Sequence, residues 1–432
     1  MKVFVTLRKW KWALCLAAVL LIPASCHKVQ KPPRNVLLLY SAGVNSLSGY
    51  LLENIKSLEG GFLPEKTKYG PDDILLVYSR QPVKYGIYTT QTPSYLIRFY
   101  ADGDGRPCRD TLRTWGKDCY AASKQTMQEV LSYVKTEFPA SHYGAIFSSH
   151  ATGWLPATYY ANPAQYERDH AGELQDAPRV SLRGRRLPSE EEFPPLTEFP
   201  PVKSMGQDLF GSTSIEMELQ DFADAIPFKL DFLLVDACLA GGVELAYALR
   251  GKADIVGFSQ TEVLADGLNY ATLTRHIFQD NPDPVSVCRD YYEHYDAQSG
   301  VYRSATISVV DTRAMEPLVT LCQQLFAKYR TQIASLDGSN VQGYYRDNRH
   351  YFYDLEDILI HAGIDTEELS ALETALDKCL LYKAATDRFI SFDIQVFSGL
   401  SMYLPSMGTP LLDQHYRTNM AWNKATLLVL VE

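Results

Sequence analysis

The sequence has no excess of positive charge, no dense set of cysteines and few of the short motifs that mark common enzyme classes. Lysine and arginine number 41 against 51 acidic residues, and no basic stripe offsets the net charge of -10, which argues against nucleic acid as a partner. The 8 cysteines are too widely spaced for the disulfide framework of a small secreted domain. The sequence also lacks a glycine-rich phosphate loop, histidines at metal-ligand spacing and a serine in a Gly-x-Ser-x-Gly turn. These absences argue against nucleotide binding, a metal site and a serine hydrolase of that kind.

The bulk composition is that of a folded globular chain. Hydrophobic residues make up 46% and charged residues 21% of the 432 positions, which are ordinary values. The length exceeds the roughly 250–300 residues at which single hydrophobic cores stop growing. We therefore expect either one large domain with appendages or two domains.

The N-terminus has the pattern of an export signal. An apolar run from Trp12 to Ile22 follows several basic residues and is too short to span a membrane comfortably. Ala24 and Ser25 stand directly before Cys26, which resembles the lipobox of bacterial lipoproteins. By that resemblance residues 1–25 are removed, Cys26 carries the lipid and residues 26–34 form a tether. A plain signal peptide followed by an incidental cysteine is the alternative.

From residue 35 onward, short apolar runs alternate with segments of helical spacing. The runs that predict buried strands are 35–43, 72–80, 143–150, 228–238, 254–260 and 305–311. An alternating segment at 94–100 predicts an edge strand. Helical spacing predicts helices at 47–57, 123–137, 214–225, 243–250 and 267–279. This order favours the α/β class, with a mostly parallel sheet flanked by helices on both faces.

Two regions depart from this alternation. Residues 155–214 are rich in proline, glutamate and arginine, and we expect them to form a long, mobile surface insertion. The part after residue 311 is more helical, with late strands predicted at 399–405 and 427–431. Helical spacing predicts helices at 313–333, 354–362 and 366–382 in this part, and one at 285–296 just before it. We therefore divide the chain into a core at 35–311 and a C-terminal extension at 312–432 that returns a late strand to the core.

The cysteines beyond the N-terminus fall into two groups. Cys108 and Cys119 flank a short polar segment and could pair across a hairpin in an oxidising compartment. Cys288, Cys322 and Cys379 lie in apolar patterns of helical spacing, which favours buried free thiols.

A histidine and a cysteine each stand at the end of a predicted strand. His150 ends YGAIFSSH and Cys238 ends FKLDFLLVDAC, and reactive groups gather at the carboxyl ends of strands in open α/β sheets. A thiolate can act as nucleophile, while an imidazole accepts its proton and later protonates the leaving amine. The sequence alone does not show whether the two strands are neighbours. We interpret Glu244, six residues after Cys238, as structural.

The segments around these two residues resemble a known family. SSHATGW at 148–154 and VDACLAGGVE at 235–244 resemble the two signature segments of the clostripain family of cysteine peptidases. FSQTEVLADGLNY at 258–270 and GLSMYLP at 399–405 are similar to further segments of that family. The resemblance implies a caspase-like fold, with Cys238 as nucleophile and His150 as general base.

The same resemblance implies an oxyanion hole. The sequence also departs from the family pattern at two positions. The backbone N–H groups of Cys238 and Ala151 would hold the oxyanion. The family has glycine at the position of Ala151, and alanine would cost about 1 kcal/mol or more if that position needs a positive φ. Ala240 stands where the family often has a larger methionine.

The family cleaves after arginine or lysine, using acidic groups at the bottom of the S1 pocket, and the resemblance implies the same here. Asp236 matches the family position two residues before the cysteine, and Asp266 lies where a second acid is expected. A carboxylate pairs well with a guanidinium group. From the residues alone, Asp236 could instead cap the helix that starts near Gly242, and Asp266 could be an exposed turn residue before Gly267.

The insertion contains a candidate processing site. Arg183, Arg185 and Arg186 lie in VSLRGRRLP, between the histidine strand and the cysteine strand. Because relatives are activated by self-cleavage in this stretch, the resemblance implies a cut after one of these arginines. A merely solvated basic loop is the alternative.

Taken together, the sequence predicts a cysteine endopeptidase that acts on peptides or proteins and is held by lipid on a bacterial envelope, at its periplasmic face or the cell surface. The chemistry requires no cofactor and no metal site is predicted. Calcium stays open because some relatives depend on it, although no acidic loop resembles a calcium-binding loop. The alternatives are a caspase-fold lipoprotein with lost or altered activity that acts in binding, and a hydrolase or sugar-binding lipoprotein with misleading short motifs.

Overall fold

The structure is a computed structural model, and it describes most of the chain after the predicted tether. The described residues are 35–43, 47–67, 72–80, 83–85, 88–90, 92–149, 151–174, 208–210, 213–345 and 349–430. Cys26, His150 and the arginines of the predicted processing site lie outside them. Within the described ranges, no helix is long and apolar enough to cross a membrane.

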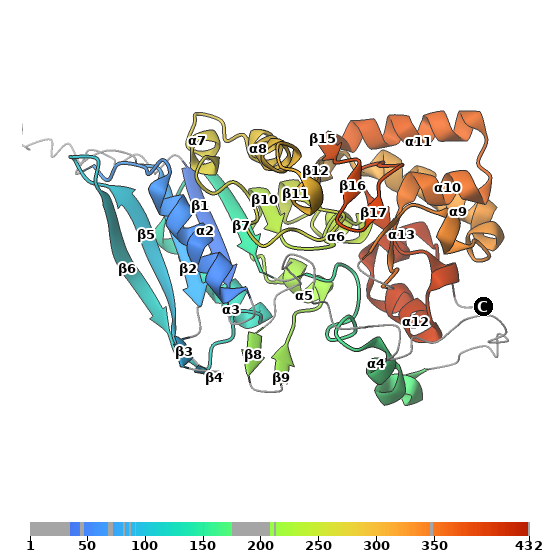
Figure 1. Cartoon of the computed structure of the whole chain (residues 1–432), viewed down its shortest axis with the longest axis horizontal. Coiled ribbons are helices and arrows are strands. Elements are labelled where there is room, and N and C mark those ends of the chain that lie inside the picture. The colour runs from blue at the N-terminus through green and yellow to red at the C-terminus, as the bar shows by residue number, and fades with distance from the viewer. Residues whose placement is uncertain are drawn as a thin grey trace, which may run out of the picture.

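A nine-stranded sheet forms the centre of the molecule (Figure 1). In spatial order its strands are β15 (Leu380–Ala385), β12 (Thr306–Asp311), β11 (Ala253–Phe258), β10 (Leu230–Asp236), β7 (His142–Ser148), β1 (Asn35–Ala42), β2 (Ile74–Arg80), β5 (Ser94–Ala101) and β6 (Pro107–Trp115). The five strands from β11 to β2 run parallel, whereas the two outer strands at each end join the sheet through antiparallel pairings. The predicted parallel sheet is therefore confirmed for its centre.

The sequence of the central strands explains their position. Every residue of β1 is buried, and β10 and β7 are buried along nearly their whole length. Parallel strands covered on both faces read as continuous apolar runs rather than as alternating ones. The edge strand β6 instead alternates between exposed and partly buried residues.

Helices cover both faces of this sheet (Figure 1). One row contains α2 (Ser48–Gly60), α7 (Leu273–Ile277) and α8 (Pro284–Asp296). Helix α7 packs on α8, and the backbone at Gly61, just after α2, lies against the backbone at Ala271, just before α7. The other row contains α3 (Lys124–Glu137), α5 (Leu219–Asp224) and α6 (Val243–Ala248). The right-handed crossovers β1–α2–β2 and β10–α6–β11 step in opposite directions along the sheet, which places their helices on opposite faces.

The C-terminal extension packs against the end of the core. In it α9 (Glu316–Ile333) contacts α10 (Leu355–Ala362), α11 (Thr366–Cys379) and α13 (Ala421–Thr426), and α13 also packs on α6. A small sheet contains β13 (Gly343–Tyr344), β14 (Phe352–Asp354) and β18 (Ser401–Met402). A bridge between Gly242 and Ser401 joins this sheet to the segment after the predicted nucleophile.

Several predicted elements have other types or boundaries. The helix predicted at 366–382 ends at Cys379 and continues directly as β15, the strand that the extension adds to the large sheet. The strand predicted at 399–405 is present, but it pairs with β14 in the small sheet. The strand predicted at 427–431 is wrong for its described part, because residues 427–430 follow α13 without strand structure. The sequence pattern also misses β6, which makes β5 an inner strand.

The predicted insertion begins as packed structure rather than as a surface loop. Leu155 and Tyr159 are buried, and α4 (Pro163–His170) is fixed to the extension by a hydrogen bond of 2.5 Å from Thr409 Oγ1 to Glu167 Oε1. At its other end β8 (Asp208–Phe210) and β9 (Thr213–Ile215) form a hairpin. The expected surface loop is therefore wrong for residues 155–174.

The cysteine predictions have mixed outcomes. Cys108 and Cys119 are both free, so the predicted pairing across a hairpin is wrong. Cys108 instead lies within β6, opposite Tyr100 of β5. Cys288, Cys322 and Cys379 are free and buried, as predicted.

Gly144 provides a test of the packing between β7 and β10. It is the register partner of Phe232, and a Cβ atom on Gly144 would lie 1.9 Å from Cζ of that ring. We expect Gly144→Ala to lower the free energy of unfolding by about 1–3 kcal/mol, because the ring must leave its place. Urea unfolding followed by tryptophan fluorescence measures this change.

The control is Gly116→Ala, where a Cβ atom would meet no atom within 4 Å. Equal unfolding midpoints for the two variants would contradict the close contact between these strands.

Candidate active site

The two strands that lead to the predicted catalytic residues are neighbours in the sheet. β7 and β10 run parallel, and their last register pair is Ser148 with Asp236. Ser148 Oγ donates a hydrogen bond of 2.9 Å to Asp236 Oδ2 across this pair. Cys238 follows Asp236 by two residues, just beyond the end of β10, and in the sequence His150 follows Ser148 by two residues. The side chain of His150 lies outside the described residues, so its predicted role stays a prediction.

Cys238 lies in a tight turn directly after β10. The N–H of Leu239 donates to Thr261 O at 2.9 Å, and Leu239 has a φ of 55°. Such values are uncommon for residues other than glycine and cluster at functional sites. The N–H of Val263 donates to Cys238 Sγ at 3.1 Å, so the segment after β11 faces the sulfur. Cys238 exposes 1% of its surface.

The backbone that follows position 150 packs on the turn after Cys238. A Cβ atom on Gly153 would lie 2.5 Å from Leu239 O, so the two turns touch at this glycine. Gly153 has a φ of 56°, whereas Ala151 is not among the residues with positive φ. The conformational cost considered for Ala151 therefore does not arise, because the left-handed position is two residues later and is occupied by glycine.

Asp236 is a buried carboxylate held by two hydroxyl groups. It exposes 2% of its surface, and Tyr270 OH donates to Oδ2 at 2.6 Å beside the hydrogen bond from Ser148. Burial and the negative charge of Asp236 raise the pKa of Tyr270 well above its usual value, so the Tyr270 hydroxyl keeps its proton and donates it to Asp236 in a hydrogen bond. The helix-cap interpretation is wrong, because the N-cap of α6 is Gly242 and has no side-chain hydrogen bond.

Asp266 lies in an exposed turn whose next residue, Gly267, contacts the buried Tyr295. Gly267 has a φ of 68°, and its N–H donates to Leu264 O, so the turn interpretation describes the local structure of Asp266. Tyr295 OH donates to Gly267 O at 3.0 Å. Burial raises the pKa of Tyr295 well above its usual value, and the negative charges of Asp236 and Asp266 raise it further. The two predicted S1 acids therefore both lie near Tyr295.

Comparison with known proteins supplies the family. Residues 197–426 match the model of the clostripain family, which is more than half of the chain and includes Cys238. The chain belongs to the clostripain family. It is accordingly a cysteine peptidase, and thus a hydrolase, as the resemblance of the short segments predicts.

Two solved structures of clostripain-family (C11) proteases are similar over almost the whole chain. An inactive zymogen of a C11 protease from Parabacteroides distasonis is 26% identical, with a TM-score of 0.71, over 91% of this chain and 98% of that one. A secreted C11 cysteine protease from Bacteroides thetaiotaomicron, in complex with an irreversible peptide inhibitor, is 22% identical, with a TM-score of 0.68, over the same shares of the two chains. These likenesses confirm the caspase-like fold. No curated protein matches the chain.

The C-terminal extension contacts the helix that follows Cys238, and no local sequence pattern predicts this contact. Glu244 at the start of α6 accepts hydrogen bonds at Oε1 from the N–H of Tyr403, at 3.0 Å, and from Tyr416 OH, at 2.7 Å. Burial raises the pKa of Glu244 to about 7. These contacts are structural, as predicted, and they join the helix after Cys238 to the extension.

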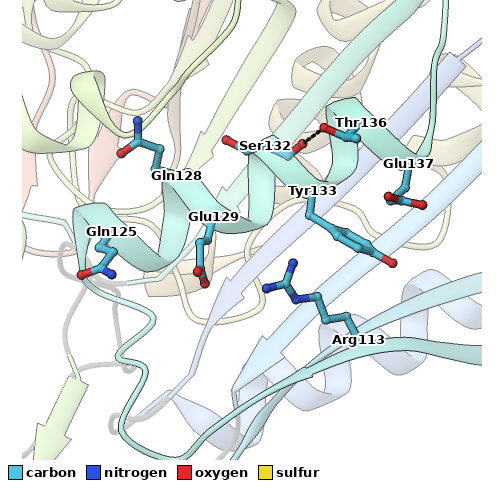
Figure 2. Close-up of a pocket in the computed structure, with 8 residues that line it drawn as sticks. All are labelled: Arg113, Gln125, Gln128, Glu129, Ser132, Tyr133, Thr136 and Glu137. Carbon is cyan, nitrogen blue, oxygen red and sulfur yellow. Dashed lines mark hydrogen bonds between the residues drawn. The ribbon is translucent and has the colours of Figure 1, made fainter.

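A surface pocket lies away from these turns (Figure 2). It is formed by α3 and the edge strand β6, and Arg113 of β6 reaches toward the Tyr133 ring of α3. Neither predicted S1 acid nor Cys238 lines it. Among the described residues, no group of three or more His, Cys, Asp or Glu could hold a metal ion.

Alkylation of the cysteines tests which thiol is activated. Burial raises the pKa of the Cys379 thiol to about 12, and it raises the pKa of Cys288 and Cys322 as well. In protein incubated until any self-cleavage is complete, we expect iodoacetamide at pH 7 to modify Cys238 at least about tenfold faster than these three, because the thiolate is the reactive form. Peptide mapping by mass spectrometry over time measures the four rates. A Cys238 that reacts as slowly as Cys288 would contradict the assignment of the nucleophile.

Proposed function

We propose that this chain is an exported, lipid-anchored endopeptidase that cleaves after arginine or lysine, with Cys238 as nucleophile and His150 as general base. The observation that carries the proposal is the position of Cys238 directly after β10, beside the strand that leads to His150. The contact between Gly153 and Leu239 supports it, because it joins the backbone that follows each residue.

The proposed reaction follows from these positions. His150 accepts the thiol proton, and the Cys238 thiolate attacks the carbonyl carbon of the scissile bond. The N–H groups of Cys238 and Ala151 donate to the oxyanion that forms. As the C–N bond breaks, His150 gives its proton to the leaving amine and a thioester remains on Cys238. His150 then takes a proton from water, whose oxygen attacks the thioester. The C–S bond breaks, the acid leaves, and His150 returns the proton to the Cys238 thiolate.

The preference for a basic residue rests on the buried acid at the carboxyl end of β10. Asp236 is held by Ser148 and Tyr270 and lies two residues before the nucleophile. A substrate guanidinium or ammonium group would gain more from a carboxylate in a buried site than in water, because the effective dielectric constant is lower there. Asp266 would add a second negative charge near Tyr295.

Activation by self-cleavage is supported by the burial of the nucleophile. Cys238 exposes 1% of its surface in the uncut chain, which leaves a substrate little access to the sulfur. Arg183, Arg185 and Arg186 lie between β7 and β10 in the sequence and match the proposed specificity. The related protein from Parabacteroides distasonis is described as an inactive zymogen.

Export and lipidation complete the proposal. The short apolar run that ends at Ala24, Ser25 and Cys26 supports removal of residues 1–25 and attachment of lipid to Cys26. The related protease from Bacteroides thetaiotaomicron is described as secreted. The proposed substrates are peptides or proteins at the bacterial envelope. Calcium is proposed as a modulator only, since the reaction itself uses thiol and imidazole.

Fluorogenic peptides with Arg, Lys, Asp, Asn or Ala at P1 test the activity and its specificity. We expect the lipid-free protein to hydrolyse the Arg and Lys peptides and Cys238→Ala to be inactive. Asp236→Ala should lose about 100-fold or more in kcat/KM for the Arg peptide, because it loses a charge-assisted contact to the substrate. Asp104→Ala in an exposed turn is the matched control and should match the parent enzyme. Retained cleavage after Arg in Asp236→Ala would refute the S1 assignment but leave Cys238 in place.

The sheet topology predicts how the cut protein behaves. A cut after Arg183, Arg185 or Arg186 separates β7 from β10 in the chain but leaves their ladder and the contact between Thr409 and Glu167 in place. We expect two fragments on a denaturing gel but one species of unchanged mass in gel filtration. Cys238→Ala should stay uncut.

Peptide sequencing of the new N-terminus identifies the cut. A variant with all three arginines replaced by alanine should remain a single chain of low activity. A fully active single chain, or fragments that separate under native conditions, would overturn self-activation as described.

A further inference from the structure

The turn that follows His150 runs into a fully buried tryptophan that is held by the C-terminal extension. The ring of Trp154 lies with its centroid 4.5 Å from that of Tyr403, 5.4 Å from that of Tyr416 and 6.2 Å from that of Phe352. All three partners come from the extension, and Trp154 exposes 1% of its surface. The extension therefore fixes the side chain at one end of this turn.

A histidine of the extension also holds the backbone of the same residue. His415 lies in α12 (Pro410–Asn419), and its Nε2 is 3.2 Å from Trp154 O. A carbonyl oxygen can only accept, so Nε2 carries the proton and donates. The other ring nitrogen, Nδ1, lies 2.9 Å from Nδ2 of Asn419, which donates to it. Both nitrogens of a neutral imidazole are thus used, and the tautomer is fixed.

The surroundings keep this histidine neutral. Burial lowers the pKa of His415 to about 4, and the contact with Trp154 O offsets only part of this effect. The carboxylate of Glu218 lies 3.9 Å from Nε2, which is beyond hydrogen-bond distance. Near neutral pH the ring therefore acts as a fixed donor rather than as a charge.

The next residue of α12 reaches the helix that follows the nucleophile. Tyr416 OH donates to Glu244 at the start of α6, six residues after Cys238. Consecutive residues of one helix thus hold the chain after each of the two proposed catalytic residues. Along the chain, Gly153 lies between His150 and Trp154 and Leu239 lies between Cys238 and Glu244, so the contact between these two turns lies between each proposed catalytic residue and its attachment.

We propose that His415 is a positioning residue of the peptidase: its N–H fixes the Trp154 carbonyl and so holds the turn 151–154, which begins directly after His150, against the turn that carries Cys238. The inference rests on the proposed function. His415 does not touch the reacting atoms. A turn that shifts by a fraction of an ångström would misalign the base and the backbone donor of Ala151, and such misplacement lowers the rate of the chemical step.

Replacement of this donor should affect catalysis more than substrate binding. We expect His415→Phe, which keeps the volume but removes the N–H, to lower kcat for the Arg peptide by about tenfold or more while KM changes by less than about twofold. His415→Gln retains an N–H donor and should recover most of kcat. His361→Phe on α10, an exposed histidine whose ring contacts Asp357 of its own helix, is the matched control and should match the parent enzyme.

A second readout separates positioning from stability. All variants are first cut with trypsin after an arginine of residues 183–186, because inactive variants do not cut themselves. In this cut enzyme we expect Cys238 to be alkylated even at low pH, because the thiolate pairs with the protonated imidazole, and His150→Ala should remove this low-pH reactivity. We expect His415→Phe to shift the profile partly toward that of His150→Ala, and His415→Gln to keep the parental profile. Thermal unfolding of each variant shows whether it is folded, and Asn419→Leu, which removes only the partner of Nδ1, is a milder substitute if His415→Phe does not fold.

The outcomes distinguish the two proposals. Identical profiles for the parent and His150→Ala would overturn the proposed catalytic pair itself. A clear difference between those two, with folded His415→Phe equal to the parent in profile and in kcat, would overturn only the positioning role of His415.

Discussion

The parallel pairing of β7 with β10 is the constraint on which the rest of the site depends. These strands are buried on both faces, so their register is set by packing from above and below the sheet as well as by the ladder itself. The last pair of the ladder, Ser148 with Asp236, is reinforced by a side-chain hydrogen bond. A shift by one residue would break that bond and exchange the two faces of one strand, so that side chains packed against one layer of helices would meet the other layer.

The sequence predicts the central strands well because each is a short apolar run, and it predicts the helices between them from their spacing. It misses β6, since this edge strand alternates between exposed and partly buried residues, with Arg109 over the Phe99 ring and Arg113 over Trp115. It also misses β15, because the chain passes from helix to strand at Cys379 and Leu380 with no glycine or proline to mark the change.

The candidate site is only partly visible in the sequence for a different reason. Strand ends reveal Cys238 and His150, and the resemblance to a family adds Asp236 and Asp266, but no local pattern states which strands are neighbours. The contact of His415 with Trp154 joins residues 261 positions apart. A single sequence does not reveal that both ring nitrogens of this histidine are hydrogen-bonded, because one of their partners is a carbonyl group from a distant part of the chain.

The division of the large sheet along the chain has a consequence for folding. Strands β6, β5, β2, β1 and β7 all precede the insertion, and β10, β11, β12 and β15 all follow it. Within the large sheet the two halves of the chain therefore meet only at the ladder between β7 and β10. During synthesis or export the first half emerges with β7 as an open, apolar edge, which is the kind of surface that recruits unrelated chains. Until β10 pairs with it, the strand that leads to the proposed catalytic base is therefore an unpaired apolar edge of the nascent protein.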